Sequence, residues 1–122
     1  AKFLSESDKI DWVLHPSLEN NKYHALARKY LPDGQGGMLS FGVKGNVKDA
    51  AKFMEALRLV TQETHVADTR SCVLHPASTT HRQLSKEELA AAGVPENLIR
   101  LSVGIENPDD IIEDLKQALQ KI

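Results

Sequence analysis

Arg100 is the residue whose type and surroundings point most directly to chemistry. It lies in an expected strand over residues 98–105, in which alternate aliphatic side chains predict a face turned to the core: Ile99, Leu101, Val103 and Ile105. Arg100 then points to the opposite face, where its neighbours Ser102 and Gly104 are small. A guanidinium with space beside it suits a two-point contact to a carboxylate or phosphate. A solvent-exposed arginine without a ligand is the commoner alternative for a strand.

The histidines and the single cysteine do not combine into a recognisable catalytic or metal site. His75 and His81 are six residues apart, and His65 and Asp68 lie upstream. This spacing matches no common zinc template, so we expect a structural or cleft-lining loop rather than a metal site. Nucleophilic chemistry at Cys72 would need a base, but on a strand His75 would face the opposite side. We therefore expect a buried, structural cysteine.

Two further motifs are expected to serve the backbone. The GQGG run at residues 34–37 precedes a strand instead of opening a helix, so it predicts a turn rather than a phosphate cradle. The STT run at residues 78–80 supports no Ser-His-Asp arrangement and is expected to hydrogen-bond its own loop. The residues alone therefore indicate one candidate anion-binding arginine and no self-sufficient catalytic constellation.

Four helices are expected from the helical spacing of apolar residues. They cover residues 22–31, 47–60, 86–92 and 108–121. Asn46 is the expected N-cap of the second helix. Ser85 and Glu88 form a capping box for the third, and Gly93 suits its left-handed end.

The strands expected between these helices complete the fold prediction. Alternation predicts strands over residues 12–14, 38–43 and 98–105, with weaker candidates at 64–67 and 71–74, while 75–84 has the character of a loop. The order of elements predicts an α+β fold. We expect a small, mainly antiparallel or mixed sheet with helices packed on one face.

Composition limits the class of protein. The 122 residues are 41% hydrophobic and 26% charged, which predicts one globular domain. The net charge of -2 argues against a nucleic-acid partner, and no apolar stretch suits a membrane span. The single cysteine suits a reducing cytosol, so a cytoplasmic location is expected. The chain does not begin with Met. We expect that it has either been processed or been cut from a longer protein.

Two motifs carry a family resemblance. HPASTTH at residues 75–81 and LIRLSVGIE at 98–106, with SKEEL and AAGV between them, resemble the C-terminal region of the Cys/Met-metabolism family of pyridoxal-phosphate (PLP) enzymes. These are the transsulfuration enzymes. DWVLHP, HALARKYLPDGQGGMLSFGVKG and NPDDIIEDLKQAL extend the resemblance over nearly the whole chain. Within the family, HPASTTHRQLS and HVADTRSCV are most similar to O-acetylhomoserine sulfhydrylases.

The resemblance implies roles for particular residues. In the family, the arginine of the IRLSVG motif, here Arg100, holds the α-carboxylate of the amino-acid substrate. A motif that is often SLG lines the pocket, and its aligned residues here are His65, Val66 and Ala67. His65 replaces the usual serine and is therefore the second candidate substrate-binding residue. Ser71 matches a position with an expected structural role.

The resemblance also implies what surrounds this chain. No lysine lies in a context that resembles the cofactor-lysine motif, so residues 1–122 are expected to be a single C-terminal substrate-binding domain whose N-terminal cofactor domain is missing. The parent is expected to use PLP and to form a homo-oligomer, a tetramer. This piece alone is expected to bind no cofactor and to be inactive.

The expected reaction of the parent is γ-replacement, which makes homocysteine or methionine from O-acetylhomoserine and a sulfur donor. Two alternatives stay open. One is a domain of a cystathionine γ-synthase or lyase. The other is a non-catalytic module that binds a small molecule or a protein partner.

Overall fold

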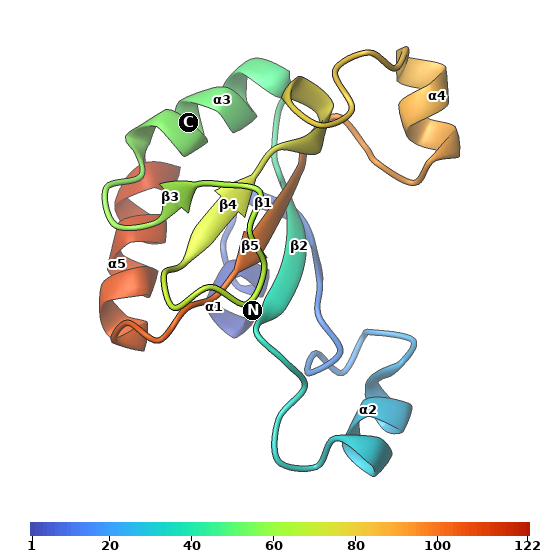
Figure 1. The fold of residues 1–122 in the computed structure, drawn as a ribbon, viewed down its shortest axis with the longest axis vertical. Coiled ribbons are helices and arrows are strands. Elements are labelled where there is room, and N and C mark those ends of the chain that lie inside the picture. The colour runs from blue at the N-terminus through green and yellow to red at the C-terminus, as the bar shows by residue number, and fades with distance from the viewer.

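One five-stranded sheet forms the centre of the computed structural model, which describes residues 1–122 (Figure 1). Its strands follow the order β1-β2-β5-β4-β3. They are β1 (Ile10–Leu14), β2 (Met38–Val43), β3 (Thr61–Gln62), β4 (Cys72–Leu74) and β5 (Leu98–Ser102). Neighbouring strands run antiparallel except β3 and β4, which are parallel. The expected α+β fold with a small mixed sheet is therefore confirmed.

Three helices cover one face of this sheet, which confirms helix packing on one face, although the first of them was not predicted. They are α1 (Lys2–Ser5), α3 (Val47–Ala56) and α5 (Pro108–Leu119). Their apolar side chains join those of the sheet in a core of 16 buried residues. Within it, Phe41 of β2 and Phe53 of α3 meet edge to face with their ring centroids 5.8 Å apart, a favourable aromatic geometry.

The other two helices stand at the ends of the sheet rather than on its face (Figure 1). Helix α2 (His24–Tyr30) buries only Ala27. Four large side chains on and beside it are half exposed or more: Tyr23, Leu26, Tyr30 and Leu31. Helix α4 (Lys86–Ala91) follows a short 3-10 turn, η1 (Pro76–Ser78). No helix in the chain combines the length and the apolar character that crossing a membrane requires.

The predicted helix ends are formed by the expected side chains. Asn46 and Asp49 form a capping box at the start of α3, and Ser85 and Glu88 form another at the start of α4. Each box satisfies backbone N–H groups that have no partner within the helix. Gly93 adopts a φ of 70° just after α4, as a left-handed helix end requires.

The helix expected over residues 47–60 was predicted too long, because it ends at Ala56. The carboxylate of Asp114 on α5 accepts the three backbone N–H groups that follow, those of Arg58, Leu59 and Val60, each at 2.9 Å. These N–H groups are therefore unavailable to helical carbonyls. The chain turns out of the helix at this point and enters β3.

Two strand predictions also need correction. The strand expected over residues 98–105 ends at Ser102, and Ile105 is 82% exposed instead of facing the core. The N–H of Ile105 bonds to the carbonyl of Thr69 at 2.9 Å, so the chain leaves the sheet to meet a loop. The weak candidate at 64–67 was wrong: no strand forms there, and Ala67 has a φ of 57°, which no strand allows. The candidate at 71–74 is confirmed as β4.

Candidate functional site

Arg100 lies on the face of the sheet opposite to the three packed helices. Its strand neighbours Ile99 and Leu101 point into the core, where they are buried. Because side chains alternate along a strand, Arg100 points the other way, as predicted. In the register of the sheet it pairs with Ser40 of β2 and Leu74 of β4. The guanidinium therefore rises from the central strand of the sheet.

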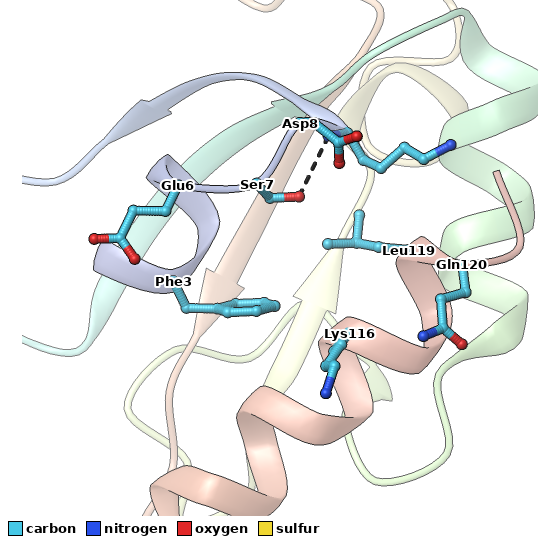
Figure 2. Close-up of a pocket in the computed structure, with 8 residues that line it drawn as sticks. Phe3, Glu6, Ser7, Asp8, Lys116, Leu119 and Gln120 are labelled. Atoms are coloured by element: carbon cyan, nitrogen blue, oxygen red, sulfur yellow. Dashed lines mark hydrogen bonds between the residues drawn. The ribbon is translucent and has the colours of Figure 1, made fainter.

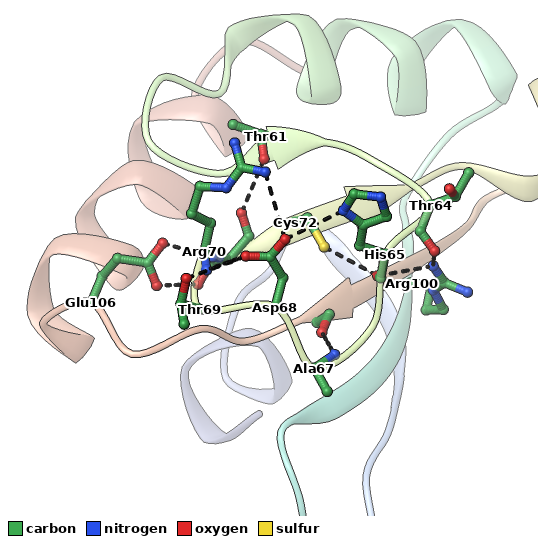
Figure 3. A network of polar contacts seen from close by, with 12 residues as sticks. Thr61, Thr64, His65, Ala67, Asp68, Thr69, Arg70, Cys72, Arg100 and Glu106 are labelled. Carbon is green, nitrogen blue, oxygen red and sulfur yellow. Dashed lines mark hydrogen bonds and ion pairs between the residues drawn. The ribbon is translucent and has the colours of Figure 1, made fainter.

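A loop over residues 63–71 crosses this second face and covers part of it (Figure 3). Ser102, on the same face as Arg100, is 2% exposed and accepts the N–H of Ala67 at 3.2 Å. A side chain at Gly104 would collide with the backbone of Thr69 and Arg70. The expectation that small residues leave space for a ligand beside Arg100 was therefore wrong at these two positions. They make room for the protein's own loop.

Arg100 is held by backbone carbonyls rather than by an acidic side chain. Its Nη2 donates to the carbonyl oxygen of Thr64 at 2.8 Å and approaches that of His65 at 3.4 Å (Figure 3). None of the five ion pairs in the chain includes Arg100. The N–H groups of Nε and Nη1 have no protein acceptor. A parallel two-point contact pairs an N–H of Nη2 with Nε–H or Nη1–H, so an external carboxylate would bind these free donors beside the bond from Nη2 to Thr64.

His65 meets Arg100 through its backbone, and its ring lies apart on the surface. The side chain is 58% exposed, and Nδ1 lies 3.3 Å from an oxygen of Asp68. The N–H of Arg70 bonds to Asp68 at 3.0 Å, and this bond is the main reason that the pKa of Asp68 is lowered to about 2, with the side chains of Arg70 and His65 adding to it. Asp68 therefore stays ionised, and the Nε2 of His65 has no partner in the chain.

Glu106 fastens the far end of this loop to the segment that follows β5. Its carboxylate accepts the N–H of Ser71 at 2.6 Å and the hydroxyl of Ser71 at 2.9 Å. That hydroxyl oxygen in turn accepts the N–H of Gly104 at 2.9 Å. Burial opposes the charge on Glu106, but the hydrogen bonds from Ser71 outweigh it and hold the pKa of Glu106 below its usual value. Ser71 thus has the structural role that was expected.

Cys72 and His75 are both buried and both structural. The Sγ of Cys72 donates to the carbonyl of His65 at 3.2 Å. His75 is 1% exposed, with Nδ1 at 2.8 Å from the hydroxyl of Ser78 and Nε2 at 2.7 Å from the carbonyl of Glu96. Both ring nitrogens are therefore occupied within the protein. No three His, Cys, Asp or Glu side chains of the chain are grouped to hold a metal ion.

The two remaining motifs serve the backbone, as predicted. The run at residues 34–37 is an irregular turn into β2, with Gly36 at a φ of 88°. In the run at 78–80, the hydroxyls of Ser78 and Thr79 both donate to the carbonyl of His75, at 3.4 and 2.8 Å. Neither segment gathers groups that could act on a ligand.

Three surface hollows lie elsewhere, and Arg100 lines none of them. One of about 950 Å³ separates β1 from α2. Another, of about 170 Å³, is almost entirely apolar and lies between α1 and α5. A third, of about 400 Å³, is shown in Figure 2 and mixes acidic and basic groups: Glu6, Asp8, Lys9 and Lys116. The strongest candidate site is therefore the open guanidinium and not a hollow.

Sequence reasoning missed the roles of Asp114 and Glu106 and the contact of Ala67 with Ser102. Asp114 carried a signal, because an acidic residue stands beside Leu115 on the apolar side of a helix and needs partners there. Glu106 and Ala67 carried none. Their roles depend on contacts with residues 35 positions away in the chain.

Comparison with known proteins places these features in a family. Residues 1–120 match the family described as Cys/Met metabolism PLP-dependent enzyme. A homocysteine synthase of Schizosaccharomyces pombe is 48% identical over 98% of this chain, and an O-acetyl-L-homoserine sulfhydrylase of Leptospira meyeri is 45% identical over 100% of it. A solved Campylobacter jejuni structure, described as an O-acetylhomoserine (thiol)-lyase with a pyridoxyl-lysine group, superposes with a TM-score of 0.89 at 43% identity over 98% of this chain. The chain spans 28% of the length of each of these proteins.

Proposed function

The chain belongs to the Cys/Met metabolism PLP-dependent enzyme family, and we propose that it is the C-terminal, substrate-binding domain of an O-acetylhomoserine sulfhydrylase. Its identity to a homocysteine synthase and to an O-acetyl-L-homoserine sulfhydrylase, 48% and 45%, supports this subfamily. The reaction proposed for the whole protein is γ-replacement. Acetate leaves O-acetylhomoserine and a sulfur nucleophile takes its place, which gives homocysteine or methionine.

The free guanidinium of Arg100 carries the proposal. An amino-acid substrate presents an α-carboxylate, and a planar guanidinium binds a carboxylate through two parallel N–H···O bonds. Arg100 has no acidic partner in the chain, and its Nε–H and Nη1–H are free to pair with an N–H of Nη2 in such a contact. By gripping the carboxylate it fixes the orientation of the bonds at Cα, which is a positioning contribution to the rate.

We assign His65 a second, weaker contact with the substrate. Its ring is exposed and keeps Nε2 free, while Asp68 engages Nδ1. A carboxylate on one nitrogen fixes the orientation of an imidazole ring. The imidazole ring is then oriented so that its Nε2 can contact a polar group of a substrate that Arg100 binds.

The residues of this chain do not form an attachment site for PLP. A lysine that forms a covalent bond to such a cofactor works in a desolvated pocket, whereas every lysine of this chain is exposed. We therefore place the cofactor in an N-terminal domain of the longer protein, with this chain forming one wall of the substrate site. A homo-oligomer, a tetramer, is the assembly that we propose for the parent.

The test uses the full-length protein with O-acetyl-L-homoserine and sulfide. Arg100→Lys removes the planar two-point contact, so kcat/KM should fall roughly 10- to 100-fold, the range for losing a hydrogen bond to a charged group. His65→Ala should raise KM by a smaller factor. Arg82→Lys, at an exposed arginine of another loop, is the matched control and should behave as the unchanged protein.

The outcomes separate the parts of the proposal. Near-normal kinetics of Arg100→Lys, with an unchanged circular dichroism spectrum, would remove Arg100 from the site. Absence of any turnover of O-acetyl-L-homoserine by the unchanged protein would overturn the proposed reaction.

A further inference from the structure

We propose that Ser102 is a positioning residue for Arg100 and acts through the backbone of residues 64–67. The inference rests on the proposed function, in which Arg100 grips the carboxylate of the substrate. Ser102 is two residues from Arg100 on β5 and lies on the same face of the sheet. Its hydroxyl bonds to the loop that supplies the carbonyls around the guanidinium.

The place of these carbonyls decides where the free donors of Arg100 point. A long arginine side chain has many rotamers, and freezing them costs entropy that a ligand would otherwise have to offset. Here Nη2 is fixed in advance by two successive carbonyls, those of Thr64 and His65. The loop thus holds the guanidinium in one orientation before the substrate arrives.

The sheet fixes the loop from below at three points. The N–H of Glu63 bonds to the carbonyl of Val73 at 3.0 Å, which extends the β3–β4 pairing into the loop. The Sγ of Cys72 donates to the carbonyl of His65 at 3.2 Å. The N–H of Ala67 donates to the hydroxyl of Ser102 at 3.2 Å. The carbonyls of residues 64 and 65 lie between the first and the last of these anchors.

Ala67 makes the contact with Ser102 from a left-handed backbone conformation. A φ of 57° is unfavourable for an alanine. The N–H of Ala67 donates to the hydroxyl of Ser102, which is its only acceptor in the chain. The contact with Ser102 and a costly backbone conformation thus occur at the same residue of the loop.

Ser102 and Cys72 cannot touch the substrate themselves. They are 2% and 3% exposed beneath the loop. Any effect of these side chains on substrate binding must therefore be indirect, and the proposal is that it passes through the loop to Arg100. This separates a positioning role from a catalytic one.

A double-mutant cycle on the full-length protein tests the proposal. KM and kcat for O-acetyl-L-homoserine are measured in Ser102→Ala, Arg100→Ala and the double variant. Ser102→Ala should raise KM roughly three- to tenfold, the factor for a hydrogen bond of ordinary net strength, with a smaller change in kcat. In the Arg100→Ala background the same substitution should change KM no further, since the effect acts through Arg100. Ser40→Ala, a serine beside Arg100 without a bond to the loop, is the control and should leave KM unchanged.

Each outcome decides one point. An equal rise of KM in both backgrounds, or no rise in either, would overturn the positioning role and leave the role of Arg100 intact. An unchanged KM in Arg100→Ala alone would overturn the proposed function and this inference with it.

If Ser102→Ala does not fold, Cys72→Ala removes the neighbouring anchor of the same loop. The positioning role predicts the same loss of additivity for that variant, and additive effects would overturn it.

Discussion

The carboxylate of Asp114 accepts the backbone N–H of Val60 at 2.9 Å, at the point where the chain passes from α3 to β3. The same carboxylate accepts the N–H groups of Arg58 and Leu59 and a side-chain N–H of Gln117. One acidic side chain on α5 therefore fixes the backbone of a segment 54 residues away. It also decides where α3 ends.

Asp114→Asn should destabilise the domain markedly. An amide has no charge and one acceptor oxygen, so it leaves at least one of the three N–H groups without a strong acceptor. The free energy of unfolding should fall by about 2–3 kcal/mol, measured by urea denaturation of the 122-residue chain. Glu113→Gln, at the exposed neighbour on α5, should change it by less than about 0.5 kcal/mol. Equal stability of the two variants would contradict the role given to Asp114.

Acid should unfold the domain through three carboxylates whose pKa values are lowered. They are Asp68, Glu106 and Asp114. At Asp114 burial opposes the charge, but backbone N–H bonds outweigh it and lower the pKa. A carboxylate with a lower pKa in the folded state stabilises fully above its unfolded pKa, near 4, and loses that contribution as the pH falls through its folded pKa.

Unfolding free energies measured between about pH 5 and about pH 2 should therefore fall steadily. The fall should be shallower for Asp114→Asn, which has lost one of the three groups. A free energy that stays constant over this interval would show that these carboxylates do not stabilise the fold.

Ala67→Gly should stabilise the isolated chain. Glycine adopts a φ of 57° without the steric cost that alanine meets, about 1–2 kcal/mol, although it also gains freedom in the unfolded state. The net gain should be up to about 1 kcal/mol in urea denaturation. Ala92→Gly is the control, because its φ of -78° suits alanine, and it should lower stability. A loss of stability in both variants would argue against the left-handed conformation of Ala67.

The 122-residue chain alone, mixed with PLP and O-acetyl-L-homoserine, should show no turnover. The reason is that all its lysines are exposed and none can serve as a desolvated cofactor lysine. The full-length protein assayed in parallel is the control. Product formed by the isolated chain would refute its assignment as one wall of a larger site.

Local signals in the sequence were sufficient to predict most of the helices and strands and the direction of Arg100, but not α1 or β3. The N-cap Asn46 and the capping box of Ser85 and Glu88 identified the starts of helices, because such caps depend on residues within one helical turn. Alternation through Ile99 and Leu101 identified the core face of β5, and hence the face of Arg100. Each of these signals lies within a few residues of the feature that it predicts.

The surroundings of Arg100 could not be predicted in the same way. The cover over Ser102 and Gly104 is a loop that lies more than 30 residues earlier in the chain, and it makes contact through the N–H of Ala67 and the hydroxyl of Ser71, neither of which has a local partner that would mark it. The end of α3 depends on Asp114, which is equally remote. Contacts of this kind are settled by tertiary packing, which overrides local propensity.

Helix α2 makes few stabilising contacts with the rest of the domain. It is seven residues long and buries only Ala27, so few contacts oppose its fraying. Its amide protons should exchange with deuterium much sooner than those of α5, because α5 packs on the sheet. A protease should also cleave the segment between β1 and β2 while the rest of the domain stays folded. This segment, which contains α2, is therefore a suitable place for a label or an inserted tag.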